Sequence, residues 1–262
     1  MGADRLRRIL GEMGSLLVAY SGGVDSTFLL WAALEALGPG RVLAATAAAP
    51  IFPQSELDAA QEMARQLGAR HRFVPTAQLE SADFVHNSPQ RCYVCKREIL
   101  TRLLALAREE GLAWVAEGSN LDDRQDDRPG VRAVRELGVR SPLEEAGLTK
   151  ADIRVLSRQA GLPTWDRPAQ PCLVTRFPYG TLITLDGLAR VAAAEAVLAS
   201  LGYRTVRVRD HGTLARIEVP AADVPRLAQP EVAAEVVEAL RGLGYAYVSL
   251  DLQGYRQGSM NR

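Results

Sequence analysis

Apolar positions in the first half of the chain fall into short runs separated by longer amphipathic segments. The runs at residues 16–20, 41–49 and 114–116 are mainly apolar, which is typical of strands buried on both faces of a parallel sheet. A further strand is predicted at residues 71–74. Helices are predicted between the runs, because apolar residues recur there every three or four positions. This alternation predicts an α/β fold with a Rossmann-like parallel sheet covered by helices.

The pattern changes in the second half, where a smaller α+β domain is predicted. Its helices are expected at residues 185–201 and 233–243, and its strands at residues 205–209, 214–219 and 245–251. The segment 161–168, Gly-Leu-Pro-Thr-Trp-Asp-Arg-Pro, is dense in turn residues. We therefore expect a domain boundary there, with one domain at residues 1–165 and a second at residues 166–262.

A glycine turn separates the first strand from the helix that follows it. The turn and the first helical residues are Ser21, Gly22, Gly23, Val24, Asp25 and Ser26. Adjacent glycines let the backbone turn tightly and approach a ligand, and the unpaired N–H groups of a helix start attract an anion. Glycines and serines are also ordinary turn and capping residues. The two hydroxyls together with Asp25 favour a phosphate-binding loop over a plain turn.

A second polar segment follows the strand at residues 114–116. It contains Gly118, Ser119, Asn120 and Asp122. Because the carboxyl ends of parallel strands meet at one edge of a sheet, this segment and the glycine turn are expected at the same edge. Taken alone, the segment is equally well explained as a turn with solvated carboxylates. The charged stretch at residues 121–132 is expected to form a loop over the active site.

The composition of the chain narrows the class of protein. Of 262 residues, 47% are hydrophobic and 24% are charged, as in globular proteins. The 31 basic and 31 acidic residues balance, so there is no general electrostatic attraction to nucleic acid. No apolar run is long enough to span a bilayer, and residues 1–10 contain no signal-peptide core. We therefore expect a cytoplasmic protein without nucleic-acid or membrane partners.

The three cysteines indicate thiol or metal chemistry. Cys92 and Cys95 have the C-x-x-C spacing that lets two thiolates bind one metal, and Cys172 is the third. An odd number of cysteines without a signal sequence argues against a disulfide framework. Free cysteines are also common as small buried residues. Three thiolates are one short of a closed all-cysteine iron–sulfur site, so a cluster held by them would keep one iron open.

The strand at residues 205–209 carries two arginines on one face. These are Arg207 and Arg209, and alternate residues of a strand share a face. Two guanidinium groups on one face suit a phosphate. The residues alone favour a different interpretation, the exposed polar face of an edge strand.

Several motifs resemble those of known families. The segment Ser-Gly-Gly-Val-Asp-Ser resembles the loop of the PP-loop ATP pyrophosphatases, which cleave ATP between the α and β phosphates and adenylylate a substrate. More specific motifs lie at residues 91–96, 117–123, 171–180, 215–219 and 254–261. Together with the loop, they resemble the LarE family of ATP-dependent sulfur transferases, which make the nickel-pincer nucleotide cofactor of lactate racemase.

This resemblance implies a reaction and a set of site residues. With ATP and Mg²⁺, a carboxylate of pyridinium-3,5-biscarboxylic acid mononucleotide would be adenylylated, and sulfur would displace AMP to give the thiocarboxylate. The implied nucleotide-binding residues are Ser21, Gly22, Gly23, Asp25, Ser26, Gly118, Ser119 and Asn120. The implied magnesium ligands are Asp25 and either Asp122 or Asp123. The implied substrate-phosphate residues are Arg207 and Arg209, with Glu195 and Glu218 as metal ligands or positioning residues.

The resemblance leaves two ways to supply the sulfur. In the simpler members of the family, a cysteine at the position of Cys172 forms a thioester with the substrate, gives up its own sulfur and becomes dehydroalanine. Other members hold a [4Fe-4S] cluster with three cysteines, and its free iron carries a transferable sulfide. This chain has Cys92 and Cys95 as well as Cys172, which favours the cluster. Under either scheme Cys172 is central.

Other functions stay open at this level. A PP-loop enzyme that transfers nitrogen would leave the three cysteines without a role. A tRNA thiolase should carry a basic surface or an added RNA-binding module. A non-catalytic nucleotide or iron–sulfur sensor would bind its ligand without releasing pyrophosphate. The LarE resemblance also implies a homo-oligomer, a trimer of dimers.

Overall fold

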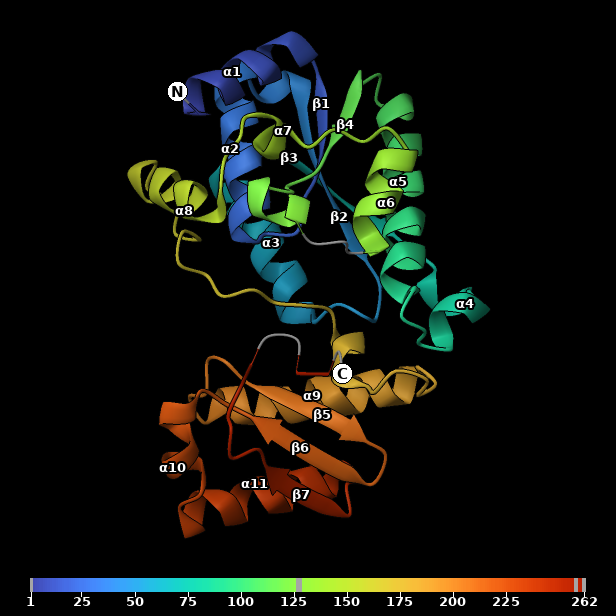
Figure 1. Cartoon of the computed structure of the whole chain (residues 1–262), viewed down its shortest axis with the longest axis vertical. Helices are drawn as coiled ribbons and strands as arrows, with labels where there is room; N and C mark the ends of the chain where they lie inside the picture. The colour runs from blue at the N-terminus through green and yellow to red at the C-terminus, as the bar shows by residue number, and fades with distance from the viewer. Residues whose placement is uncertain (1, 126–128, 257–258, 261–262) are drawn as a thin grey trace. The chain divides into compact units, whose positions relative to one another are not determined.

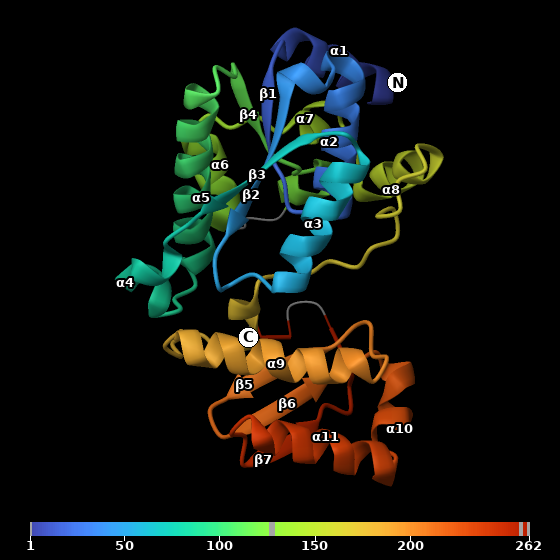
Figure 2. The ribbon, with the colours of Figure 1, turned by 180° about the vertical axis from the view of Figure 1, so that it is seen from behind.

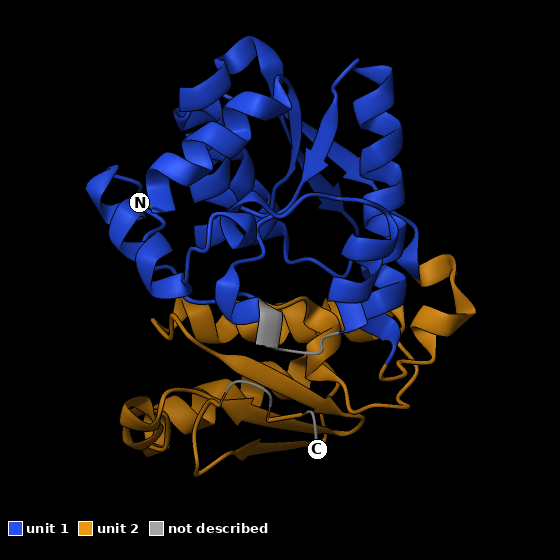
Figure 3. Cartoon of the chain, turned by 45° about the horizontal axis from the view of Figure 1, so that its top comes forward, with its two compact units in different colours: residues 1–78, 90–170 blue, residues 79–89, 171–262 orange. Residues whose placement is uncertain are grey.

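The computed structural model describes the chain except residues 1, 126–128, 257–258 and 261–262 (Figure 1, and Figure 2 from behind). It divides into two compact units. Unit 1 comprises residues 1–78 and 90–170, and unit 2 comprises residues 79–89 and 171–262 (Figure 3). The domain boundary expected between residues 165 and 166 lies inside unit 1, which extends to residue 170. The reason is Arg167, which donates to the carbonyl of Gly22 and to the Glu56 carboxylate, both in unit 1.

Unit 1 is built on a four-stranded sheet with the strand order β3-β2-β1-β4. The strands are β1 (Leu16–Ala19), β2 (Val42–Ala48), β3 (Arg70–Pro75) and β4 (Trp114–Ala116). Every neighbouring pair is parallel, which confirms the predicted α/β class. The carboxyl ends of β1 and β4 lead into the glycine turn and the second polar segment.

Helices cover both faces of this sheet. They are α1 (Gly2–Met13), α2 (Val24–Leu37), α3 (Gln54–Gln66), α5 (Arg91–Glu109), α6 (Pro129–Glu136), α7 (Pro142–Glu145) and α8 (Lys150–Gln159), with the short 3₁₀ helices η1 (Pro39–Arg41) and η3 (Leu121–Gln125). Leu16 and Val18 pack into one core with α1, α2 and α8, whereas Leu17 packs into a second core with α5 and α6. Figures 1 and 2 show these two groups of helices on opposite sides of the sheet. Successive residues of β1 therefore face different cores, which is why the strand is apolar throughout.

Three helices of unit 1 were not expected, namely α1, α6 and the short α7. Helix α1 buries Leu6, Leu10 and Met13. Helix α6 begins at Pro129, inside the segment 121–132 that was predicted to be a loop. The loop prediction was therefore wrong for residues 129–132. The helix forms because Ala133 and Val134 are buried, the latter in the core shared with α5. Residues 126–128 of the expected loop lie outside the described residues.

Unit 2 is the expected smaller α+β unit. Its helices are α4 (Ala82–Val85), α9 (Leu185–Ser200), α10 (Val224–Leu227) and α11 (Pro230–Gly242), and its strands are β5 (Arg207–His211), β6 (Leu214–Glu218) and β7 (Tyr247–Leu250). Three short 3₁₀ helices are η2 (Gln78–Glu80), where the chain enters the unit, η4 (Leu173–Arg176) and η5 (Ala221–Asp223). The sheet order is β5-β6-β7, with β5 antiparallel and β7 parallel to β6. None of the helices in the described ranges combines the length and apolar character that a membrane span needs.

One face of the sheet in unit 2 is apolar and the other is charged. Val208 and Ile217 lie opposite each other in the ladder and pack into a core with α9 and α11. Arg207 lies opposite Glu218, and Arg209 lies opposite Arg216. Because alternate residues share a face, these four charged side chains lie on the face away from the core. Arg207, Arg209 and Glu218 are nevertheless buried.

Candidate active site

The glycine turn after β1 is closed by hydrogen bonds between its two serines. The hydroxyl oxygens of Ser21 and Ser26 lie 3.0 Å apart, and the Ser21 N–H donates to the Ser26 hydroxyl over 3.3 Å. Gly22 has a φ of +71°, and a Cβ there would lie 2.9 Å from the backbone of Ala60. The position therefore requires glycine both for its backbone conformation and for space.

The second polar segment lies against the first turn of α2. A Cβ on Gly118 would lie 3.1 Å from the backbone nitrogen of Ser26, so any larger residue would crowd the start of α2. Asn120, which follows closely, is buried, and its side-chain oxygen accepts from the Asp122 N–H over 3.0 Å. The segment is therefore ordered beside the glycine turn, while its carboxylate Asp122 is exposed, as the interpretation of a solvated turn expected.

Asp25 faces a lysine that the sequence did not single out. Its Oδ2 lies 2.5 Å from Lys150 Nζ, while its Oδ1 is buried with no hydrogen-bond partner in the described part of the chain. Burial raises the pKa of Asp25, although Lys150 acts in the opposite direction. The backbone N–H of Lys150 also donates to Asp122 Oδ2 over 2.8 Å. Lys150 thus connects two of the expected magnesium ligands.

The start of α8 explains how Lys150 reaches this place. Thr149 and Asp152 form a capping box, in which each side chain accepts from the backbone N–H of the other. The cap fixes the first turn of α8, and Lys150 is its first residue. The contact of Lys150 with Asp25 was not expected from the sequence.

A buried glutamate, Glu117, connects the second polar segment to α5. It accepts hydrogen bonds from Lys96, from the Ser119 N–H and from the Ser141 hydroxyl. Burial alone would raise the pKa of the Glu117 carboxyl, but Lys96 and the two hydrogen bonds outweigh it and hold the pKa below its ordinary value. Glu117 is therefore a buried anion with a matched cation.

Cys92 and Cys95 lie in the first turn of α5. Cys92 is exposed and Cys95 is half-buried. Residues three positions apart lie on the same side of a helix, so both thiols can reach one ligand. The Gln78 amide donates to Cys95 Sγ over 3.7 Å.

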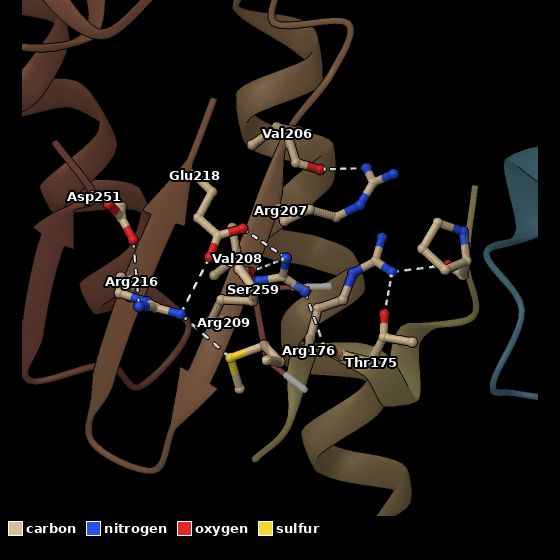
Figure 4. A network of polar contacts seen from close by, with 12 residues as sticks. Thr175, Arg176, Val206, Arg207, Val208, Arg209, Arg216, Glu218, Asp251 and Ser259 are labelled. Carbon is tan, nitrogen blue, oxygen red and sulfur yellow. Dashed lines mark hydrogen bonds and ion pairs between the residues drawn. The ribbon is translucent and has the colours of Figure 1, made fainter. Parts of the chain in front are cut away.

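Cys172 belongs to unit 2, where two arginines hold its turn. Arg176 is buried and donates to the carbonyls of Pro171 and Cys172 over 2.8 and 3.0 Å. Arg209 donates to the carbonyl of Thr175 over 3.0 Å (Figure 4). The backbone that carries Cys172 is therefore fixed by side chains from other segments of the unit.

The two glutamates of unit 2 that the resemblance singled out, Glu195 and Glu218, are both paired with arginines. Arg176 donates to both oxygens of Glu195 over 2.8 Å. Glu218 accepts from Arg209 over 2.6 Å and from Arg216 over 3.1 Å (Figure 4). Among the described residues, no three His, Cys, Asp or Glu side chains form a group that could hold a metal ion.

Arg207 and Arg209 share a face of β5, which is an edge strand as one interpretation of the sequence proposed. That interpretation also expected the two arginines to be exposed, and this part of it is wrong, because the exposed fractions of Arg207 and Arg209 are only 2% and 4%. Burial lowers the pKa of Arg207, and the neighbouring charge of Arg176 acts in the same direction. Arg209 adds to this lowering of the pKa, whereas Glu195 and Tyr255 oppose it.

The chain has curated relatives that match nearly its whole length, although no protein-family model matches it. It is 44% identical over 259 residues to an uncharacterised protein of Synechocystis, which covers 99% of this chain and 96% of the relative. It is 41% identical over 253 residues to the pyridinium-3,5-bisthiocarboxylic acid mononucleotide synthase of Lactiplantibacillus plantarum, which covers 96% of this chain and 91% of that protein. A more distant relative, 29% identical over 230 residues, is the tRNA(Ile)-lysidine synthase of a Bradyrhizobium strain, with 78% of this chain and 61% of that protein covered.

Proposed function

The chain belongs to the LarE family of pyridinium-3,5-bisthiocarboxylic acid mononucleotide synthases, and we propose that it is an ATP-dependent sulfur transferase of nickel-pincer nucleotide biosynthesis. In this reaction a carboxylate oxygen of pyridinium-3,5-biscarboxylic acid mononucleotide attacks the α-phosphorus of ATP, and pyrophosphate leaves. A sulfide equivalent then attacks the acyl carbon of the adenylate. The bond from that carbon to the AMP oxygen breaks, AMP leaves with the electron pair, and the thiocarboxylate remains.

The observation that carries the proposal is the meeting of the glycine turn, Gly118 and Asp25 at the start of α2. Backbone N–H groups at a helix start bind phosphate, and the two glycine positions leave room for it. We propose that Ser21, Gly23 and Ser26 bind the phosphates together with Gly22, and that Gly118, Ser119 and Asn120 border the adenylate.

The same place suits a magnesium ion bound with ATP. A buried carboxylate oxygen without a hydrogen bond is costly, and Asp25 Oδ1 is such an atom among the described residues. Magnesium prefers one or two carboxylates together with phosphate oxygens, which Asp25, Asp122 and the nucleotide would supply. Lys150 would add a positive charge next to the phosphates, where negative charge develops as pyrophosphate leaves.

In unit 2 we propose that Arg207 and Arg209 bind the phosphate of the substrate. The positive charge around Arg207 supports this proposal, because a buried guanidinium close to two others is stabilised by an anion. Glu195 and Glu218 are better suited to positioning the arginines than to holding a metal, because guanidinium groups already occupy their oxygens. The small-molecule partner is thus the pyridinium mononucleotide.

We propose that Cys92, Cys95 and Cys172 hold a [4Fe-4S] cluster. The spacing of Cys92 and Cys95 on one side of α5 fits two thiolate ligands, and the fixed turn of Cys172 fits a third. When bound, such a cluster supplies sulfide at the iron that no cysteine ligates. In the other scheme the Cys172 thiolate displaces AMP, and its Cβ–S bond then breaks in a β-elimination that leaves dehydroalanine. The homo-oligomer that the family resemblance implies is part of the same proposal.

The experiment uses protein purified without oxygen and incubated with ATP, Mg²⁺ and the pyridinium substrate. We expect pyrophosphate, AMP and thiocarboxylate to form only when ATP and substrate are both present. A brown protein with iron and sulfide, and with unchanged intact mass after turnover, supports the cluster. A colourless protein that loses the mass of hydrogen sulfide supports sacrifice of Cys172. Absence of pyrophosphate release would overturn the proposed function and favour a sensor.

A further inference from the structure

Glu117 is a buried carboxylate whose two oxygens bind two different parts of unit 1. Oε1 accepts from the Ser119 N–H over 3.0 Å and from the Ser141 hydroxyl over 2.7 Å. Oε2 accepts from Lys96 Nζ over 2.9 Å. The Glu117 side chain is 5% exposed and that of Lys96 is 33% exposed. One oxygen therefore holds the segment after β4, and the other holds helix α5.

These two parts carry the two halves of the proposed reaction. Ser119 lies in the segment that borders the proposed adenylate. Lys96 follows Cys95 directly, in the first turns of α5, so it moves with both cysteines of the pair. Helical backbone is rigid over one turn, and fixing Lys96 therefore also fixes the thiols of Cys92 and Cys95.

Stability alone does not explain this pair. Exchanging a buried ion pair for apolar residues is often neutral or even stabilising, because removing two charges from water costs about as much as their attraction returns. The pair fixes the position of helix α5 relative to the segment after β4.

We propose that Lys96 and Glu117 are a positioning pair, which holds the cysteine-bearing turn of α5 in place relative to residues 118–120 so that sulfur, and not water, captures the acyl adenylate. The inference rests on the proposed function and adds to it the residues that couple its two steps. Sulfur attack on the acyl carbon gives thiocarboxylate and AMP, whereas water attack returns the carboxylate and AMP. The pair thus determines how much product forms for each pyrophosphate.

The test is the ratio of thiocarboxylate to pyrophosphate in the full chain under anaerobic turnover. Lys96→Met keeps the apolar stem and removes the charge. We expect the ratio to fall about tenfold, since a misplacement of about 1 Å can cost about a hundredfold in rate. Pyrophosphate release should stay within about threefold of wild type, because Oε1 still holds the adenylate segment. Lys96→Arg, which restores the cation, should recover the ratio.

The matched control is Arg102→Met, which breaks the 3.0 Å ion pair of Arg102 with Glu98 on the same helix, where both side chains are more exposed. This control should keep the wild-type ratio. If Lys96→Met lowers pyrophosphate and product in proportion, the pair is only structural and the inference is overturned. If Lys96→Met does not fold, Lys96→Gln provides the same readout with a neutral donor. A wild-type protein that releases no pyrophosphate would instead refute the proposed function, and this inference with it.

Discussion

At the scale of single residues, Gly22 is a position in the candidate site where the backbone leaves no room for another side chain. We expect Gly22→Ala to lose most pyrophosphate release and to lower the free energy of unfolding by about 2 kcal/mol or more, since a positive φ costs an alanine about 1–2 kcal/mol and a close contact adds to it. Gly68→Ala is the control, because Gly68 has a φ of +66° with no atom within 4 Å of the added Cβ. It should show the conformational cost alone and keep activity. Equal losses in both variants would contradict the close approach at Gly22. Denaturant unfolding and pyrophosphate release measure the two effects.

Lys150 carries the second prediction for a single residue. Lys150→Met should reduce the rate of pyrophosphate release at least about tenfold, because the variant removes a charge near the phosphates and leaves Asp25 buried without a cation. Lys150→Arg should retain more of the rate. Arg158→Met, in the last turn of the same helix, is a suitable control and should change little. A Lys150→Met enzyme with the wild-type rate would show that the ion pair with Asp25 is not used in adenylylation.

His71 predicts a dependence of stability on pH. Its Nε2 lies 2.8 Å from the Thr46 hydroxyl, and burial lowers its pKa below the ordinary value. The imidazole of His71 therefore binds a proton more readily in the unfolded chain than in the folded protein. Its contribution to the free energy of unfolding is present above the unfolded pKa and is lost as pH falls from about 6.5 toward the folded pKa. We expect the unfolding free energy of wild type to fall more between pH 7.5 and 5.5 than that of His71→Gln. Parallel pH profiles would exclude this role.

The sequence predicted those site residues that lie in local motifs. The glycine turn was found because glycine, serine and aspartate follow each other directly between a strand and a helix. Lys150 and Arg167 were not placed at this turn, because they reach it only through the fold, from 125 and 145 residues away. No local pattern distinguishes them from other surface cations, so only the tertiary structure reveals them.

At the scale of elements, the turn that carries Cys172 depends on one ion pair between η4 and α9. Arg176→Met should lower the free energy of unfolding by about 3–5 kcal/mol, because the Glu195 carboxylate, which is only 14% exposed, would lose the cation that it is paired with. The double variant Arg176→Met/Glu195→Met should be less destabilised than the sum of the single variants. Additive losses in a denaturant double-mutant cycle would show that the two side chains do not act as a pair.

Elements were predicted best where burial is uniform. Strands β1 and β2 were located because both of their faces are covered, which leaves a continuous apolar run. Helix α6 was missed since its charged sequence resembles a loop, and only Ala133 and Val134 contact the core. Strand β5 was expected at residues 205–209 and lies at Arg207–His211, because its ladder with β6 extends to the pair of His211 and Leu214.

At the scale of the whole molecule, the chain order does not reveal the division into units. Residues 79–89 belong to unit 2 because the Asn87 side chain donates to the carbonyl of Pro178 over 2.7 Å and its own carbonyl accepts from the Gly180 N–H. Contacts between segments about 90 residues apart leave no periodic signal in the sequence. The turn-rich stretch at residues 161–168 was therefore the best available sign of a boundary.

The proposed cluster leads to a prediction for the chain as a whole. Cys172 is far from Cys92 and Cys95 in the sequence, so a cluster held by all three would add a constraint that the apoprotein lacks. Binding to the folded state alone raises its stability by mass action. We expect reconstitution with iron and sulfide to raise the thermal midpoint of the wild-type protein. Cys172→Ser should bind less iron and show no such rise, whereas an equal rise in wild type and Cys172→Ser would mean that Cys172 is not a ligand and would favour its role as the sulfur donor.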